Sequence, residues 1–381
     1  MSHDSSLSRR RMLQGAGGLA ALAAFGPASF RVSPAAAQEA VEVSMWGNHP
    51  EWKEAMEALI AAFEAANPDV KIDFSAVTSD QYGAKIQTAI AGGQTSDIFG
   101  EQEGGIVVNV AKGGDLPYID LTGKVAVVTG ASRGIGEAIA LRYAQEGAKV
   151  VVSARTVEEG DHILPGSINS VVKRIKDAGG EAIAVKCDLS SREERENLIK
   201  ESEAAFGPVD ILVNNAAITY FIPVDDFPEK RFKLMTEVQV YGPFHLAQLV
   251  LPKMREKKSG WILNISSHAA LHPKLDSPGR GGTVYGMCKA ALERFTTGLA
   301  AEASNDNIGV NVISPGLIAT PGVLHHGLVN DSNKDMAVPV ENMAEACLYL
   351  VHGDASKNSG AITYADVVLR EQKLTPAELI A

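Results

Sequence analysis

Cysteine is scarce in this sequence, and its pattern excludes two common kinds of site. Cys187, Cys288 and Cys347 are far apart, none belongs to a CxxC pair, and no cysteine–histidine spacing suggests zinc. The number is odd, so a disulfide framework is not expected. The adjacent His325 and His326 are interpreted as loop histidines. The sequence therefore predicts reduced, buried thiols and no metal site.

Excess positive charge and long apolar runs are also missing. Lys and Arg total 35 against 46 Asp and Glu, a formal net charge of -11, which argues against binding nucleic acid through its phosphates. One apolar run near the N-terminus is too short and too rich in glycine to cross a bilayer. Hydrophobic residues make up 45% of the 381 residues, enough for a large core and two or three domains. These limits favour a soluble protein with a small-molecule ligand.

Residues 1–37 are typical of a targeting segment. The stretch SRRRML places arginines before the short apolar run, and AAAQEA supplies small residues for cleavage after Ala37. Paired arginines before a weakly apolar run resemble a twin-arginine signal, which exports folded proteins. A disordered basic tail is the alternative. The signal predicts a periplasmic protein.

Residues 38–116 alternate between strand and helix patterns. VEVSMW alternates like a strand, and Leu59, Ile60 and Phe63 recur at helical spacing before Pro68. The strand-like VKIDFSAV, a helix ending at two glycines and a short third strand follow, which completes a β-α-β-α-β fragment.

This fragment resembles the start of the family 1 extracellular solute-binding proteins of sugar transporters, which hold their ligand between two lobes. Only the first part of one lobe is present. Aromatic residues of that family stack on the sugar, and Trp46 and Trp52 could do so here. A periplasmic sugar-binding component of an ABC transporter is therefore the alternative function. Without the second lobe, packing is the more favourable interpretation of both tryptophans.

Residues 117–381 begin with a different pattern. KVAVVTG is a short apolar run expected for a strand buried on both faces, and TGASRGIG turns it directly into an amphipathic helix. The spacing of Gly130, Gly134 and Gly136 suits a tight turn and a close approach of the backbone to a pyrophosphate at the helix N-terminus. Further strand patterns alternate with helix patterns. The fold class expected is α/β, a Rossmann doubly wound parallel sheet.

Four motifs together resemble the short-chain dehydrogenase/reductase family, over residues 121 to about 370. They are TGASRGIG, NNAA, YGMCK and SPGLIAT, and the long loop after the second strand, with its LPG sequence, is similar to hydroxysteroid-dehydrogenase-like members. The resemblance implies an NAD(P)H-dependent oxidoreductase that transfers hydride between nicotinamide and a carbonyl or secondary alcohol. The LPG loop hints at a bulky hydrophobic substrate. The cofactor-binding positions that the family implies are these: Gly130, Ser132, Arg133, Gly134, Ile135, Gly136, Arg155, Asp188, Asn215, Ala216, Lys289, Pro315, Gly316 and Thr320.

The family's catalytic roles fall on matching residues. Tyr285 would exchange a proton with the substrate oxygen, Ser267 would hold that oxygen, and Lys289 would bind the nicotinamide ribose. Tyr285 and Lys289 are four apart and share one helix face, so we expect the ammonium to lower the pKa of the phenol. Gln239 stands where the family has a catalytic asparagine, and either still organises a water relay to Lys289 or weakens it.

The cofactor is expected to be NADP(H) rather than NAD(H). NAD-specific relatives carry an acid at the end of the second strand, where this chain has Ala154 followed by Arg155. Arg133 lies inside the glycine loop. Two guanidinium groups without a neighbouring carboxylate suit a 2′-phosphate. Exposed arginines with loose selectivity are the alternative.

The chain therefore looks like a fusion, with its seam near Leu121, at letters that both families share. Recombination and an error of sequence assembly both explain such a seam. If the fusion is accidental, the enzyme belongs in the cytoplasm. The loop at 268–284 either shapes the substrate entrance or is a surface insertion. Relatives pair through their long central helices, so a homo-oligomer is expected.

Overall fold

The computed structural model describes most of the chain from Ile119 onward and five short segments before it: residues 41–47, 53–68, 70–76, 98–100, 106–108, 119–274, 281–329, 331 and 333–380. These residues fall into two compact units that divide between Tyr118 and Ile119. The predicted signal, Trp52 and the second helix of the fragment lie outside the described residues. Within the described part, no helix is both long and apolar enough to span a membrane.

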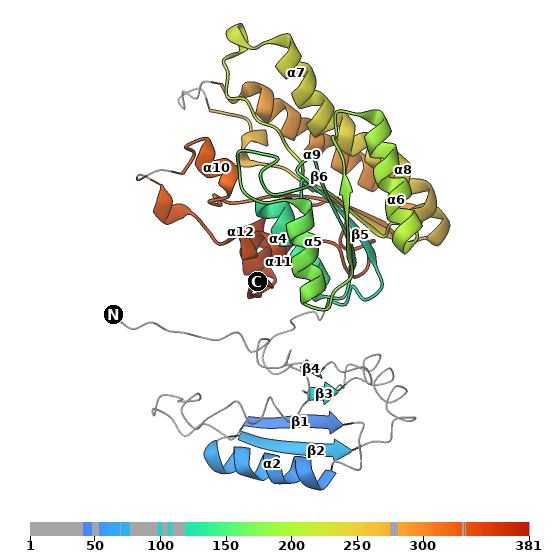
Figure 1. Cartoon of the computed structure of the whole chain (residues 1–381), viewed down its shortest axis with the longest axis vertical. Coiled ribbons are helices and arrows are strands. Elements are labelled where there is room, and N and C mark those ends of the chain that lie inside the picture. Colours follow the sequence, from blue (N-terminus) through green and yellow to red (C-terminus); the bar gives the residue numbers. More distant parts are fainter. Residues whose placement is uncertain are drawn as a thin grey trace. The chain divides into compact units, whose positions relative to one another are not determined.

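The described residues of the first unit form a small sheet with the order β2-β1-β3-β4 and one helix (Figure 1). β1 pairs in parallel with β2 and β3, and β4 is antiparallel to β3. The helix buries Met56 and Ile60, whereas Leu59 and Phe63 are half-buried, so the buried stripe starts earlier than predicted. The elements are β1 (Val41–Gly47), α2 (Lys53–Ala66), β2 (Val70–Ala76), β3 (Ile98–Gly100) and β4 (Ile106–Val108).

The second unit confirms the predicted doubly wound sheet. Its seven strands have the order β11-β10-β9-β8-β5-β6-β7 and every neighbouring pair is parallel. The chain starts in the middle at β5, winds to one edge, and returns through β8 to the other edge. The strands are β5 (Val125–Thr129), β6 (Lys149–Ala154), β7 (Ala182–Lys186), β8 (Ile211–Asn214), β9 (Gly260–Ile265), β10 (Ile308–Ser314) and β11 (Ile362–Tyr364).

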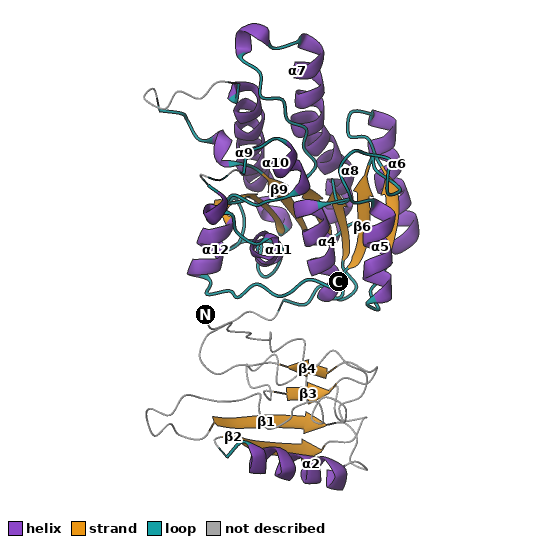
Figure 2. Ribbon diagram, turned by 60° about the vertical axis from the view of Figure 1, so that its left-hand side comes forward, coloured by secondary structure: helices purple, strands orange, loops and turns teal. Residues whose placement is uncertain are grey.

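Helices cover both faces of this sheet, which explains why β5 and β10 are buried throughout (Figure 2). One hydrophobic core lies under α4, α5 and α11, and a second lies under α6, α8 and α9. The helices are α4 (Gly134–Gln145), α5 (Ile168–Asp177), α6 (Arg192–Phe206), α7 (Glu229–Thr236), α8 (Gly242–Lys257), α9 (Thr283–Ala303), α10 (Pro321–His325), α11 (Val340–Tyr349) and α12 (Ala365–Glu371).

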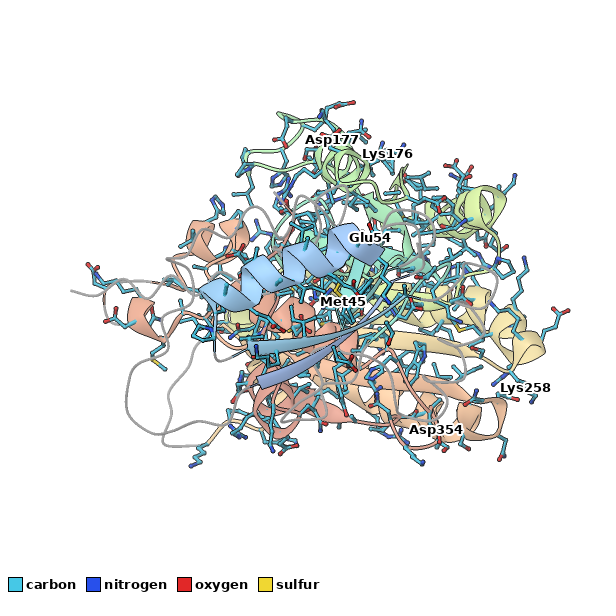
Figure 3. The ribbon with its side chains drawn as sticks, turned by 90° about the horizontal axis from the view of Figure 1, so that it is seen from below. Met45, Glu54, Lys176, Asp177, Lys258 and Asp354 are labelled. Atoms are coloured by element: carbon cyan, nitrogen blue, oxygen red, sulfur yellow. The ribbon has the colours of Figure 1, made fainter. Side chains whose placement is uncertain are left out.

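Charged side chains mark the outer surface of this layered unit, although Arg142, Arg195 and Lys289 are among the buried exceptions. Lys176 and Asp177 at the end of α5, Lys258 after α8 and Asp354 after α11 all point outward (Figure 3). The apolar and polar faces are thus separated as the amphipathic helix patterns predicted. The site must be sought where the strands end, because parallel strands present their carboxyl ends at one edge, beside the point where the strand order reverses.

Candidate active site

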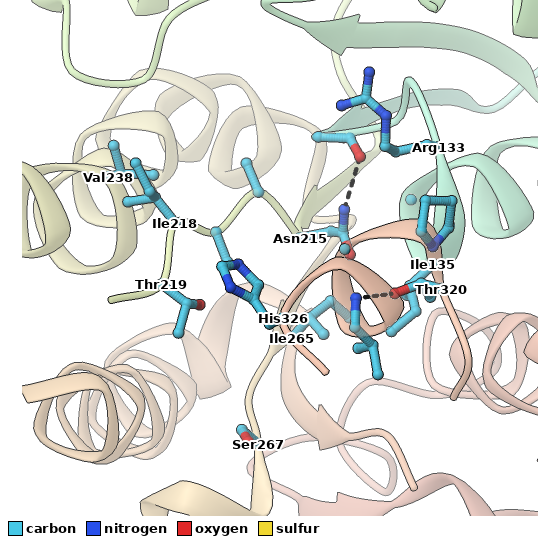
Figure 4. Close-up of a pocket in the computed structure, with 18 of the residues that line it drawn as sticks. Arg133, Ile135, Asn215, Ile218, Thr219, Val238, Ile265, Ser267, Thr320 and His326 are labelled. Atoms are coloured by element: carbon cyan, nitrogen blue, oxygen red, sulfur yellow. Dashed lines mark hydrogen bonds between the residues drawn. The ribbon is translucent and has the colours of Figure 1, made fainter. Parts of the chain in front are cut away.

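A cavity of about 910 Å³ opens at the carboxyl ends of the strands of the second unit. In the close-up of this cavity, Arg133 lies near the top and Ser267 near the bottom, and Asn215 and His326 lie between them (Figure 4). Of the predicted site residues, Gln239 is the one that does not line the cavity. The lining includes all the others: Gly130, Ser132, Arg133, Gly134, Ile135, Gly136, Arg155, Asp188, Asn215, Ala216, Ser267, Tyr285, Lys289, Pro315, Gly316 and Thr320.

The turn from β5 into α4 forms a cradle for an anion. The helix begins at Gly134, and the side chain of the preceding Arg133 makes no capping hydrogen bond, so the helix N-terminus faces the cavity. A Cβ on Gly136 would lie 2.4 Å from Asn215 Nδ2 and from the Gly130 carbonyl oxygen. Gly136 is therefore required by the packing of the turn itself, and not only by the approach of a phosphate.

Asn215 ties this turn to the end of β8. Its Nδ2 donates to the carbonyl oxygens of Thr129 and Gly130, at 2.8 and 3.1 Å, and its own backbone N–H donates to Thr129 Oγ1 at 3.0 Å. The N–H of Ala216 donates to the same hydroxyl at 3.2 Å. Both residues line the cavity, but their visible role is to fix the shape of the glycine turn.

Tyr285, Ser267 and Lys289 meet at the other end of the cavity. The Tyr285 phenol and the Ser267 hydroxyl are hydrogen-bonded. Lys289 Nζ lies 5.6 Å from the centre of the Tyr285 ring and donates to the Ile265 carbonyl oxygen at 2.8 Å. The structure thus brings together the three residues that the sequence singled out, from β9 and α9.

The electrostatics of this group differ from the sequence expectation. Burial raises the pKa of Tyr285 above its usual value, although the hydrogen bond from Ser267 works in the other direction. Burial also lowers the pKa of Lys289 to about 8, with Cys288 opposing the shift. The expected lowering of the phenol's pKa by Lys289 is therefore wrong for this structure, because burial of the phenol outweighs the hydrogen bond from Ser267.

The end of β9 fixes the catalytic groups from several directions. Ser266, next to Ser267, donates its hydroxyl to the Glu293 carboxylate of α9 at 2.7 Å. Ser267 Oγ accepts the N–H of Ala269 at 3.2 Å. The His268 ring stacks on Tyr364 with 4.5 Å between centroids. Sequence reasoning missed Glu293 and Tyr364, because contacts between distant segments leave no motif.

Gln239 lies behind the cavity, in a five-residue π-helical segment (Glu237–Tyr241) between α7 and α8. It is 1% exposed, and its Nε2 donates to the Ile218 carbonyl oxygen at 2.9 Å. Its Oε1 is buried and has no hydrogen-bond partner among the described residues. A π-helical segment frequently marks a functional position, and an unpartnered buried acceptor is a place for a water molecule.

The two arginines expected at the 2′-phosphate are not equivalent. The Arg133 side chain donates to the loop after β6, namely to the carbonyl oxygens of Leu164, Pro165 and Gly166 and to Thr156 Oγ1. Arg155 is exposed and lies 4.0 Å from an Asp188 carboxylate oxygen. The expectation of two arginines with no carboxylate nearby was wrong, because strand ends that are separate in sequence adjoin in the sheet.

Asp188 lines the cavity at the end of β7 with its carboxylate partly engaged. Its Oδ1 accepts the backbone N–H and the hydroxyl of Ser190, at 2.9 and 2.8 Å. Burial opposes ionisation, but these hydrogen bonds and the charge of Arg155 keep the pKa of Asp188 below its usual value. The carboxylate is therefore an ionised acceptor, as an adenine amino group requires.

The remaining walls of the cavity are largely apolar. Phe221 stands between Tyr285 and His326, with ring centroids 6.3 and 6.0 Å away. Thr320 caps α10 by accepting the Val323 N–H at 3.3 Å. His268 and Ala269, from the described beginning of the 268–284 loop, also line the cavity, whereas residues 275–280 lie outside the described part. His325 and His326 also line the cavity, at the C-terminal end of α10.

Metal chemistry has no visible site in this unit. Among the described residues, no group of three or more His, Cys, Asp and Glu side chains could hold a metal ion. The three cysteines are buried thiols, and burial raises the pKa of Cys187 to about 12.

Comparison with known proteins identifies this arrangement. Residues 124–326 match the family model for short chain dehydrogenase. The chain belongs to this family. As a short chain dehydrogenase it is an oxidoreductase, which decides against the sugar-binding alternative. Residues 46–120 match the model for bacterial extracellular solute-binding protein, so the resemblance of the first unit is confirmed as well.

Several relatives support the family membership of the dehydrogenase unit. The chain is 36% identical over 250 residues to a 7alpha-hydroxysteroid dehydrogenase of Escherichia coli strain K12, covering 64% of this chain and 92% of the relative. A solved hydroxysteroid dehydrogenase from Escherichia coli superposes with a TM-score of 0.56 at 34% identity, over 65% of this chain and 97% of that one. A 3-oxoacyl (acyl-carrier-protein) reductase from Agrobacterium tumefaciens, solved with NADP bound, gives 0.57 at 30%, over 64% and 93%.

Proposed function

We propose that the dehydrogenase unit interconverts a carbonyl compound and a secondary alcohol, with Tyr285 as the general acid and base. The contact between Tyr285 and Ser267, with Lys289 beside the ring, carries this proposal. The test is turnover of a panel of cyclic ketones by the full chain with NADPH or NADH, followed by the loss of absorbance of the reduced nicotinamide. Cofactor binding without turnover of any ketone or alcohol would contradict it.

The chain's own residues have distinct tasks in this reaction. A bound nicotinamide supplies or accepts the hydride. Ser267 holds the substrate oxygen and Tyr285 delivers a proton to it, because a buried phenol with a raised pKa stays protonated at neutral pH. Lys289 offsets the negative charge left on the phenol and binds the cofactor ribose. Gln239 Oε1 holds a water that links Lys289 to solvent, which extends the role of the family's asparagine to the longer amide.

The pH profile of ketone reduction should fall on the alkaline side at an unusually low pH. Lys289 is charged below about pH 8 and neutral above it, whereas Tyr285, with its raised pKa, stays protonated through this window. We expect kcat/KM to drop about tenfold per pH unit above about 8, since a neutral amine no longer stabilises the developing phenolate. Measurement from pH 6 to 10 checks this, and a flat profile up to pH 9.5 would refute the assignment to Lys289.

NADP(H) is the preferred cofactor in this proposal. Arg155 provides an exposed cation just after β6. No acidic residue directly follows Ala154 there to accept a hydrogen bond from the ribose 2′-hydroxyl of NAD(H). Arg155→Ala should raise the Kd for NADP⁺ about tenfold and leave the Kd for NAD⁺ within twofold. Titration of both cofactors by calorimetry checks this. Equal weakening of both would show that Arg155 does not contact the 2′-phosphate.

The cavity walls suit a bulky, apolar carbonyl substrate. Phe221, Ile218 and Val238 contribute hydrocarbon to the lining, and Phe221 packs edge-on against Tyr285. From the 268–284 loop, His268, Ala269 and Gly282 line the cavity. The hydroxysteroid dehydrogenase relatives favour a ring system of comparable size. We assign the 268–284 loop to shaping this entrance.

The arrangement of the whole chain is also proposed. It consists of a signal at 1–37, a solute-binding fragment at 38–116 and the dehydrogenase at 117–381. The signal, if the fusion is genuine, directs the protein to the periplasm, and otherwise the enzyme is cytoplasmic. Two copies associate through α8 and α9. Tyr241, just before α8, Phe244 on α8 and Met287 on α9 are large apolar side chains that are 38–44% exposed.

A further inference from the structure

The loop between β6 and α5, residues 156–167, is fastened onto the glycine turn. Arg133 Nε donates to the Pro165 carbonyl oxygen at 2.7 Å, and its Nη2 donates to the Gly166 carbonyl oxygen at 2.8 Å. A Cβ on Gly166 would lie 2.4 Å from the Ser132 carbonyl oxygen. The two backbones therefore touch, and only glycine allows this approach. The sequence analysis connected this loop only with a bulky hydrophobic substrate, through its length and its LPG sequence.

Hydrogen bonds inside the loop give it a defined shape. The Gly166 N–H donates to the Glu159 carboxylate at 3.0 Å. The Asp161 carboxylate accepts the N–H groups of Val157 and Glu158, at 3.1 and 2.9 Å. The loop is thus a built element that holds its side chains at fixed positions beside the cavity.

His162 is the titratable residue that this described loop adds to the lining of the cavity, where Thr156, Ile163 and Leu164 also lie. Its Nδ1 accepts the Leu164 N–H at 3.0 Å. An acceptor at Nδ1 places the proton of the neutral ring on Nε2. Within the described residues, Nε2 has no hydrogen-bond partner, so it is a donor available to a ligand.

Two arginines and a second histidine act on this ring from three separate elements. Arg133 comes from the glycine turn, Arg155 from the end of β6 and His325 from α10, and each opposes protonation of His162, whose pKa is lowered first by burial and then by these charges. The acidic groups nearby are engaged elsewhere: Asp188 lies 4.0 Å from Arg155, and Glu159 accepts the Gly166 N–H. Together the four side chains line one part of the cavity with an excess of positive charge.

We propose that His162 binds the 2′-phosphate of NADP(H) together with Arg155, with Nε2–H as the donor. This inference rests on the proposed preference for NADP(H) and adds a residue that no motif of the sequence indicates. Arg133 serves mainly as the anchor that sets the loop, because most of its donors are used by loop oxygens. The glycine turn therefore fixes the loop through Arg133, and the loop in turn holds His162 where it can bind the 2′-phosphate.

The assignment has a consequence for pH. In the free enzyme the neighbouring cations favour the neutral ring. A phosphate dianion beside Nε2 favours the charged ring, so NADP⁺ binds with uptake of a proton. The affinity for NADP⁺ should therefore fall as the pH rises from 6 to 8. The affinity for NAD⁺, which lacks the 2′-phosphate, should not follow this change through His162.

Two substitutions separate the loop-shaping role of His162 from its phosphate contact. His162→Asn places an amide oxygen near the position of Nδ1, so it can still accept the Leu164 N–H, but it has no group at the position of Nε2. His162→Gln places an amide N–H near the position of Nε2, as a donor that cannot become charged. His352→Gln is the matched control, because His352 lies after α11 and does not line this cavity.

The experiment measures the Kd of the full chain for NADP⁺ and NAD⁺ by calorimetry at pH 6 and pH 8. We expect His162→Asn to weaken NADP⁺ about tenfold at pH 6 and to leave NAD⁺ unchanged. We expect His162→Gln to lose less affinity but to lose the pH dependence, and His352→Gln to behave like the wild type. An unchanged Kd for NADP⁺ in His162→Asn, or equal weakening of both cofactors, overturns the proposal. Wild-type protein that binds NAD⁺ as tightly as NADP⁺ instead overturns the cofactor preference itself.

Discussion

Tyr285→Phe is expected to lower kcat/KM for ketone reduction by about 10² to 10⁴-fold, while the Kd for NADPH stays within twofold. The phenol is the only proton donor that the described structure places against Ser267. Phenylalanine keeps the ring that packs against Phe221, so the fold and the substrate wall are preserved. Steady-state kinetics with the best ketone of the panel, together with calorimetric titration of NADPH, measure both quantities.

Tyr220→Phe is the matched control for this substitution. Tyr220 lines the same cavity, and its ring lies 4.7 Å from the Arg231 guanidinium. Loss of its hydroxyl should change kcat/KM only a few-fold, since it does not contact Ser267. If Tyr285→Phe keeps a tenth or more of the wild-type turnover, proton transfer by Tyr285 is not the chemical role of this residue.

Tyr285→Phe also separates two functions: catalysis, and binding of the cofactor without turnover. Gln239 leaves room for that second reading, because its amide replaces the asparagine of the family pattern. A chain that binds NADPH and reduces no ketone, with or without Tyr285, would favour the binding role. A wild-type rate of ketone reduction that is lost in Tyr285→Phe favours catalysis. In that case the buried Gln239 Oε1 still holds the water that links Lys289 to solvent, despite the longer side chain.

The fold was predictable because its strands are continuous runs of apolar residues that the sequence shows directly. β5 and β10 are buried on both faces, which demands continuous apolar, β-branched residues, and the sequence shows them. The helices between them have amphipathic patterns of ordinary length. The order of the strands was not predicted, since neither burial nor periodicity states which strands are neighbours.

The catalytic residues were predictable for a local reason. Tyr285 and Lys289 are one helical turn apart, so the sequence fixes their common face. Their pKa values were not predictable in the same way. Lys289 is buried with its Nζ against the Ile265 carbonyl oxygen at the end of β9, and this burial moves its pKa to about 8. Spacing along a helix does not reveal how much water the fold removes from the two groups.

The cofactor end of the cavity shows the opposite case. Arg133 looked like a phosphate ligand because the glycine loop carries it, and the structure turns it toward the carbonyl oxygens of a loop about 30 residues further along. His162 had no sequence signal, since an exposed loop histidine is common. Contacts between two loops depend on the whole fold, and the sequence contains no periodicity that encodes them.

Arg142→Met is expected to lower the free energy of unfolding of the dehydrogenase unit by about 3–5 kcal/mol. The Arg142 side chain is 1% exposed; its Nε donates to Glu345 Oε2 at 2.7 Å and its Nη1 pairs with Glu146. Burial disfavours the charge, but both carboxylates hold the pKa of Arg142 above its usual value. Methionine fills the space and leaves the buried Glu345 with only the Ala377 N–H, at 3.3 Å.

Urea denaturation followed by circular dichroism measures this change, and a double substitution tests its cause. Arg142→Met with Glu345→Leu should recover much of the loss, because removing both charges leaves no uncompensated carboxylate between α4 and α11. Lys173→Met, which breaks an exposed pair with Asp177 on α5, should cost less than about 0.5 kcal/mol. If the double variant is less stable than Arg142→Met, the two helices depend on the ion pair for their packing, and the desolvated charge is not what destabilises the single variant.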